Sequence, residues 1–237
     1  MIIRKVIYSI LNLFDHRKEK IPNLFLQKFK KHPNLLRKDK QRIRVCVNEI
    51  IRYLGLIDHL IEVGSERKIR HINSKIRNIL RLGIYELVFD DITPDFAAIH
   101  SSVELAKKNI NKKSSSMVNA VMRNIQRISQ KNKKWKMSLI KNKIDLAYPE
   151  WLLKKWEDEF GKDITRNLCA EFLNKKDVFI RLDIDRYSVD KMLSVLTNSN
   201  IKVIQHNYFK LFFKVVLGQK NILGNNLFQE DRKSTRL

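Results

Sequence analysis

Polar side chains that could bind phosphate recur at helical spacing between Lys112 and Arg127. Asn119, Arg123 and Arg127 follow one another at intervals of four residues, so on a helix they would lie along one face. Guanidinium and ammonium groups offer phosphate oxygens both positive charge and hydrogen bonds. This pattern predicts a helix whose polar face binds a phosphate-rich polyanion.

Positive charge is concentrated in two segments of the 237-residue chain, whose net charge is +23. Residues 1–44 have a net charge of +10, and residues 105–136 contain ten Lys or Arg and no acidic residue. A composition rich in Lys, Asn and Ile would explain a high total, but that bias would spread the lysines evenly. Because single-sign clusters create strong surface potentials, we expect an anionic partner.

The sequence offers little for catalysis or metal binding. Cys46 and Cys169 lie among apolar residues, without a CxxC motif or a His at ligand spacing, which predicts buried free thiols in a reducing compartment. The glycines form no GxGxG loop. The apolar N-terminal run reaches a charge at Asp15, so we expect an amphipathic helix and not a signal peptide. We expect a cytoplasmic protein without a membrane span, catalytic residues, or metal and cofactor sites in this chain.

Apolar residues at three-to-four spacing predict helices through the first 140 residues. One continuous pattern extends from Ile43 to Ile61, and Gly83 would allow two helices to approach closely. The segment 90–95 reads as a turn with Asp95 as a helix cap, and KKSSS at 112–116 reads as a loop that supplies N-cap serines. The basic segment 131–143 is the expected connector between domains.

The pattern changes after this connector. We expect a helix that starts at Pro149, a strand over 177–184, a helix over 188–199, and strands over 201–205 and 209–216. Trp151 and Trp156 could stack on bases, although the helical spacing favours packing for Trp156. The predicted fold is therefore mainly α, with a helical bundle over residues 1–140 followed by a small α+β subdomain over 145–230.

Several linked segments resemble the NusB-type RNA-binding domain. LRLGIYEL at 80–87, a turn with proline, AAIHSSVELAKK and MVNAVMRNI follow that family's order. Further matches are Arg4 with Ile10–Leu11, the Asp39–Lys40 pair, Arg52 and Asp58. Ser101 departs from the family, which usually has an acidic residue there. The resemblance implies a NusB-like helical bundle that binds RNA.

The segment 147–230 resembles the part of RsmB-type (Sun/Fmu) 16S rRNA cytosine-C5 methyltransferases that joins the NusB-like domain to the catalytic domain. AYPEWLLKKWEDEFG, FIRLDIDRYSVDKMLSVL and ILGNNLFQE make up this match, with Asp183 where the family has Asn. The family transfers a methyl group from S-adenosylmethionine with a Cys nucleophile, but its glycine-rich loop and its Pro-Cys and Thr-Cys dipeptides are missing here. We therefore expect a truncated chain that is inactive alone, with a non-native tail at 231–237; an ordinary disordered basic tail is the alternative.

The resemblance and the charge clusters together indicate RNA, most simply 16S rRNA, as the partner. The alternative is a NusB-type transcription antitermination factor that binds RNA and a ribosomal protein, and a complete enzyme with an unrecognised site is a third interpretation. The expected RNA contacts are basic residues from both clusters: Arg4, Lys5, Lys107, Lys108, Lys112, Lys113, Arg123 and Arg127.

Overall fold

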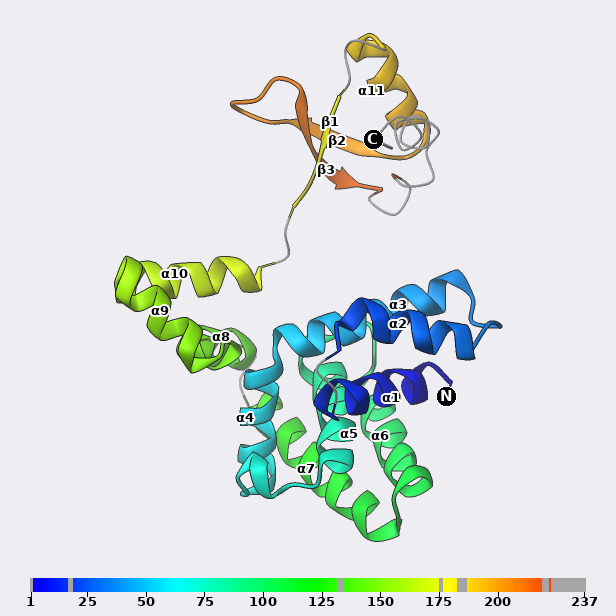
Figure 1. Ribbon diagram of the computed structural model, residues 1–237, viewed down its shortest axis with the longest axis vertical. Helices are drawn as coiled ribbons and strands as arrows, with labels where there is room; N and C mark the ends of the chain where they lie inside the picture. Colours follow the sequence, from blue (N-terminus) through cyan, green and yellow to red (C-terminus); the bar gives the residue numbers. More distant parts are fainter. Residues whose placement is uncertain are drawn as a thin grey trace. The chain divides into compact units, whose positions relative to one another are not determined.

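The computed structural model describes residues 2–16, 19–131, 134–174, 177–182, 187–218 and 222. The chain divides into two compact units, Met1–Leu173 and Asn174–Leu237 (Figure 1). The suspected non-native tail at 231–237 and Asp183 lie outside the described residues.

The first unit is built from helices, as predicted. Helix α5 lies among α1, α4, α6 and α7 and is buried along most of its length (Figure 1). The bundle helices are α1 (Ile2–His16), α2 (Ile21–Lys31), α3 (Arg37–Arg52), α4 (Leu54–Ser65), α5 (Ser74–Ile84), α6 (Asp95–Asn109) and α7 (Lys112–Gln130), with the short helical turns η1 (Ile69–His71) and η2 (Tyr85–Phe89).

The apolar stripes read from the sequence form the core of this bundle. On α7, Val118, Val121, Met122 and Ile125 are buried, which is the face expected from the three-to-four spacing. The continuous pattern from residue 43 to residue 61 is divided, however, because the chain leaves helical geometry at Tyr53 between α3 and α4. The prediction of buried faces is confirmed, and the single apolar pattern is divided between two helices.

The segment 112–116 is helical, which corrects the predicted loop. Helix α7 begins at Lys112, and its N-cap is Asn111, whose side chain accepts a hydrogen bond of 2.8 Å from the backbone N–H of Ser114. Asparagine is as good an N-cap as serine, so the helix starts one turn earlier than expected. Asp95 is likewise not a cap: α6 begins at this residue, and its carboxylate accepts hydrogen bonds from Gln126 and Gln130.

The basic connector includes a helix that was not predicted. It contains α8 (Trp135–Lys143), followed by η3 (Ile144–Ala147), α9 (Glu150–Phe160) and α10 (Lys162–Leu173). A small apolar cluster around Leu56 of α4, Ile144 and Cys169 attaches these elements to the bundle, so the first unit extends to Leu173. Trp156 packs on Phe172 with ring centroids 5.7 Å apart, as the helical spacing indicated.

The second unit contains a three-stranded antiparallel sheet of order β1-β3-β2, formed by β1 (Val178–Arg181), β2 (Lys202–Gln205) and β3 (Phe212–Leu217). Helix α11 (Val189–Asn198) covers one face of the sheet (Figure 1). Met192 and Leu196 of α11 pack with Ile180, Phe213 and Val215 of the strands. The predicted α+β pattern is confirmed over these residues.

Replacement of Gly83 by alanine is expected to lower the free energy of unfolding by about 1–3 kcal/mol. Gly83 of α5 is buried, and an added Cβ would lie 2.5 Å from Ser102 Oγ of α6 and 2.9 Å from Met122 of α7. The predicted close approach of helices is thus confirmed.

Urea denaturation followed by tryptophan fluorescence measures the change in stability of Gly83→Ala. Ser116→Ala, on the exposed side of α7, is the control. Gly161→Ala is unsuitable because φ at Gly161 is +79°, which strains any residue with a Cβ. A loss as small as that of the control would contradict the prediction.

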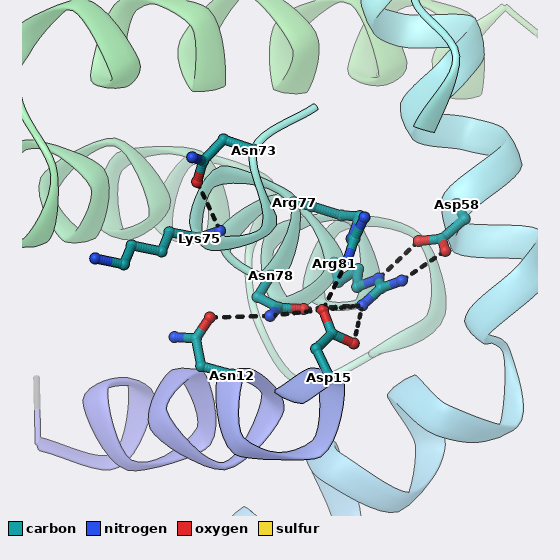
Figure 2. A network of polar contacts seen from close by, with 8 residues as sticks. All are labelled: Asn12, Asp15, Asp58, Asn73, Lys75, Arg77, Asn78 and Arg81. Carbon is teal, nitrogen blue, oxygen red and sulfur yellow. Dashed lines mark hydrogen bonds and ion pairs between the residues drawn. The ribbon is translucent and has the colours of Figure 1, made fainter. Parts of the chain in front are cut away.

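A network of polar contacts joins α1, α4 and α5 (Figure 2). The Arg81 guanidinium donates two hydrogen bonds of 2.7 Å to the Asp58 carboxylate and reaches Asp15 at 2.9 Å. Arg77 and Asn78 also donate to Asp15. Burial opposes the charge of Arg81, but the bonds from both carboxylates outweigh it and raise the pKa of the guanidinium. Asp58 is thus held by Arg81, whereas Asp15 is shared between Arg81 and Arg77.

Candidate nucleic-acid interface

Four of the predicted lysines meet where α6 turns into α7. Lys107 and Lys108 lie in the last turn of α6, Lys112 and Lys113 open α7, and all four are exposed. The two helices pack against each other, so the turn at Asn111 brings these pairs together. Lys108 also forms an ion pair of 3.6 Å with Glu104. The result is a concentrated positive charge at one end of the helix pair.

The first turn of α7 has an unusual charge for a helix start. It contains Lys112 and Lys113 and no acidic residue. A helix N-terminus carries a partial positive charge from its free N–H groups, which favours anions and disfavours cations. The lysines therefore add to the positive potential of the helix end instead of neutralising it, and a bound anion would relieve this repulsion.

The exposed face of α7 continues this charge along the helix. Arg123 and Arg127 are exposed there, about 16–22 Å from Lys112 at 1.5 Å per residue. Their guanidinium groups donate to the side-chain oxygens of Gln126 and Asn124, at 3.1 and 3.4 Å. Among the described residues, no carboxylate forms an ion pair with either arginine. These charges are accessible to a ligand, as a phosphate contact requires.

Arg4 does not belong to this exposed set. Its side chain is only 13% exposed, and its guanidinium forms an ion pair with Glu86 and donates a hydrogen bond of 2.7 Å to Ser102 Oγ. Burial lowers the pKa of Arg4 to about 10. The contacts hold α1 against η2 and α6, so Arg4 serves the packing of the bundle in this structure. The expectation that Arg4 contacts RNA is replaced by this internal role, because its charge is already neutralised by Glu86.

Lys5 follows Arg4 on α1 and is exposed. The Arg4–Ser102 contact places this first turn beside α6, where a pocket of about 270 Å³ opens between the two helices. Its lining residues are Arg4, His100, Ser101, Glu104, Leu105 and Lys108. Ser101, which stands where the resemblance predicts an acidic residue, thus lines the same pocket as Lys108. The participation of Lys5 in one surface with the α6 lysines stays a prediction.

The two thiols are poorly placed for nucleophilic chemistry. Cys46 and Cys169 are both free and buried. Burial raises the pKa of the Cys46 thiol to about 11 and also raises the pKa of Cys169. Because the thiolate is the nucleophile, neither side chain is activated at neutral pH. Within the described part of the chain, no three acidic, His or Cys side chains are grouped as a metal site.

Sequence reasoning missed the partners of the buried charges. Glu86 lies 82 residues from Arg4, and Asp15 lies 66 residues from Arg81. It also missed the exposed aromatic side chains near residue 208. The run of aromatic residues at 208–213 carries this information in the sequence, although aromatic residues also favour strands.

Comparison with known families fits this arrangement. The NusB family model matches residues 1–127, which span the bundle and the α6–α7 surface. The chain belongs to the NusB family. A second family model, described as the ferredoxin-like domain of RsmF/B-like methyltransferases, matches residues 148–212. The NusB domain is thus followed in the same chain by a domain typical of rRNA methyltransferases, which confirms the resemblance seen in the sequence. The second match includes α9 and α10, although these helices pack with the NusB domain in the first unit.

Two relatives that match about two thirds or more of the chain are methyltransferases by name. "Probable ribosomal RNA small subunit methyltransferase B" of Synechocystis sp. is 30% identical over 76% of this chain and 40% of its own length. The protein of the same name from Bacillus subtilis is 28% identical over 66% of this chain and 35% of its own length. The chain therefore spans less than half of the length of these two methyltransferase relatives.

A solved structure resembles the NusB domain. The antitermination factors NusB and NusE in complex with dsRNA match with a TM-score of 0.50 and 26% identity, over 53% of this chain and 93% of the other. Among the described residues of our chain, none of the helices combines the length and apolarity that crossing a membrane requires.

Proposed function

We propose that the chain is the RNA-binding N-terminal part of a cytoplasmic, S-adenosylmethionine-dependent 16S rRNA cytosine-C5 methyltransferase. The observation that carries this proposal is the presence of a NusB domain and an RsmF/B-like ferredoxin-like domain in one chain. The names of the two methyltransferase relatives support the rRNA substrate. In this proposal the chain holds the RNA, and methyl transfer takes place elsewhere.

The residues present do not fit a binding site for S-adenosylmethionine or a Cys nucleophile that attacks cytosine. No GxGxG loop occurs in the sequence, and both thiols are buried with raised pKa values. We therefore assign no chemical step to this chain. Its contribution is positional: exposed cations of α6 and α7 contact phosphate oxygens and fix the orientation of the RNA without reading its sequence.

Binding to a 16S rRNA fragment tests this function. Filter binding of the whole chain should show association at 50 mM salt that weakens by about a thousandfold at 200 mM, if six or more phosphates are contacted. A protein of similar size without net charge gives the background level of RNA retention on the filter. Absence of binding at 50 mM salt would overturn the proposal.

The alternative function is that of an antitermination factor, which the solved NusB–NusE–dsRNA complex supports. Such a factor would pair with a ribosomal protein of the NusE type, and the NusB domain alone does not separate the two functions. The second domain at 148–212 favours the methyltransferase assignment. A stoichiometric complex with the ribosomal protein, together with equal affinity for 16S rRNA and unrelated RNA, would favour the alternative.

A further inference from the structure

The second unit leaves one face of its sheet uncovered by α11. Ile180, Phe213 and Val215 point toward α11, so the alternate residues of the same strands point to the opposite face. The strand register places Phe179 beside Lys214, and Arg181 beside Phe212. This open face, defined by Phe179, Arg181, Ile204, Phe212 and Lys214, combines aromatic and cationic side chains.

Aromatic rings gather at one end of the open face. His206 lies 5.6 Å from Phe179 and 5.1 Å from Phe209, and Phe209 lies 5.7 Å from Phe212, measured between ring centroids. Tyr208 lies 6.0 Å from His206. Tyr208 is 87% exposed and Phe209 is 61% exposed, so their ring faces are open to a ligand. Large rings are normally buried, and a group of them at the surface indicates a binding function.

The loop that carries these rings is held in place. His206 Nδ1 accepts hydrogen bonds from the backbone N–H groups of Tyr208 and Phe209, at 3.1 and 3.3 Å. The backbone N–H of His206 donates to the backbone carbonyl of Phe212 at 2.8 Å, which joins the loop to β3. The rings are therefore positioned before a ligand arrives, and less conformational entropy is lost on binding.

Cations lie at the edges of this aromatic group. Arg181 and Lys210 are exposed, and Lys214 forms an ion pair of 2.7 Å with Asp177. A surface for another protein would be expected to be apolar at its centre and depleted in lysine. Rings interspersed with cations instead match a nucleic-acid strand, whose bases stack on aromatic faces while its phosphates meet the positive charges.

We propose that the open face and the loop at 206–209 bind single-stranded RNA through stacking of unpaired bases on Tyr208 and Phe209. This inference rests on the proposed function, since it requires that the chain binds RNA. It adds a second contact surface with a different preference. The α6–α7 surface contacts phosphates of any RNA, whereas the rings require bases that are free of a duplex.

Paired variants of the whole chain test the stacking. The variant Tyr208→Leu/Phe209→Leu keeps apolar side chains but removes the ring faces, and Tyr208→Phe/Phe209→Tyr keeps both rings. Fluorescence anisotropy with a 12-nucleotide single strand should show affinity about tenfold or more lower for the leucine variant, and unchanged affinity for the ring-exchanged variant. A 12-base-pair duplex of the same sequence should bind both variants as it binds the original chain.

Equal single-strand affinity of the leucine variant and the original chain would overturn the inference. If sedimentation then showed loss of self-association in the leucine variant, the face would be a protein contact and the inference would again fail. Failure of the proposed function would give a different result, because the original chain would then bind neither the single strand nor the duplex. Both substituted positions are exposed, and circular dichroism checks that each variant is folded.

Discussion

Replacement of Arg81 by leucine is expected to lower the free energy of unfolding of the first unit by about 3–5 kcal/mol. The side chain is almost fully buried and bridges Asp15 of α1 and Asp58 of α4. Leucine would leave Asp58 without its cation and Asp15 with Arg77 alone. An uncompensated charge in a partly buried site costs far more than a lost surface pair. Urea denaturation followed by tryptophan fluorescence reports on this unit alone, because Trp135, Trp151 and Trp156 all lie within it.

Arg52→Leu is the matched control for this experiment. Arg52 pairs with Glu49 within α3, and its side chain is 35% exposed, so its loss should cost no more than about 1 kcal/mol. A second comparison adds Asp15→Asn and Asp58→Asn to Arg81→Leu. These changes remove the two carboxylate charges and should recover part of the lost stability. Similar losses for Arg81→Leu and Arg52→Leu would show that the network contributes little.

The same network gives the sign of the acid response. Burial alone would raise the pKa of Asp15, but the bonds and charges of Arg77 and Arg81 outweigh it and lower the pKa below its ordinary value. A carboxyl with a lowered folded-state pKa stabilises the fold above its unfolded pKa, and this contribution is lost as the pH falls through the folded value. In Arg81→Leu, part of this acid-sensitive stability should already be missing at neutral pH.

Reversal of charge on α7 is expected to weaken RNA binding by about a hundredfold or more at low salt. The variant is Lys112→Glu/Lys113→Glu/Arg123→Glu/Arg127→Glu, in which all four sites are exposed. If each residue contacts one phosphate, the slope of log K against log salt should become shallower by about 3, because fewer counterions are released from the RNA on binding. Filter binding to the 16S fragment over 50–200 mM salt measures both quantities.

A charge-matched control separates local contacts from the overall charge. Four exposed lysines outside the α6–α7 surface, changed to glutamate, alter the net charge by the same amount; they are Lys141, Lys154, Lys155 and Lys162. This control should weaken binding much less and leave the salt slope nearly unchanged. Equal effects of the two variants would mean that RNA responds to the net charge of +23 and not to a defined surface.

The helices of the bundle could be predicted because burial follows the apolar repeat directly. Val118, Val121 and Met122 face the core as their spacing requires. Boundaries were less predictable, since Asn111 competes with the serines at 114–116 as a cap and the geometry at Tyr53 divides an unbroken apolar pattern. Helix α8 does not follow from the local pattern: three of its nine residues are lysine, and contacts of Trp135 and Leu139 with the core stabilise it.

The candidate site shows the same division between local and distant information. The exposure of Lys107, Lys112 and Arg123 follows from their place opposite the apolar stripe of their own helix. The internal role of Arg4 depends on Glu86, which no local pattern connects to it. A lone charge in a sequence does not reveal whether its counterion is a solvent ion, a ligand or a distant side chain.

The lysines at the start of α7 also imply a trade-off between folding and binding. Acidic residues at Lys112 and Lys113 would suit the helix dipole, at about 0.3–1 kcal/mol each, so the helix forgoes this stabilisation. A stability screen of this protein would therefore select acidic substitutions here that strengthen the fold while weakening the proposed binding of polyanions. Engineers who optimise such a domain by melting temperature alone would remove the property that distinguishes this helix.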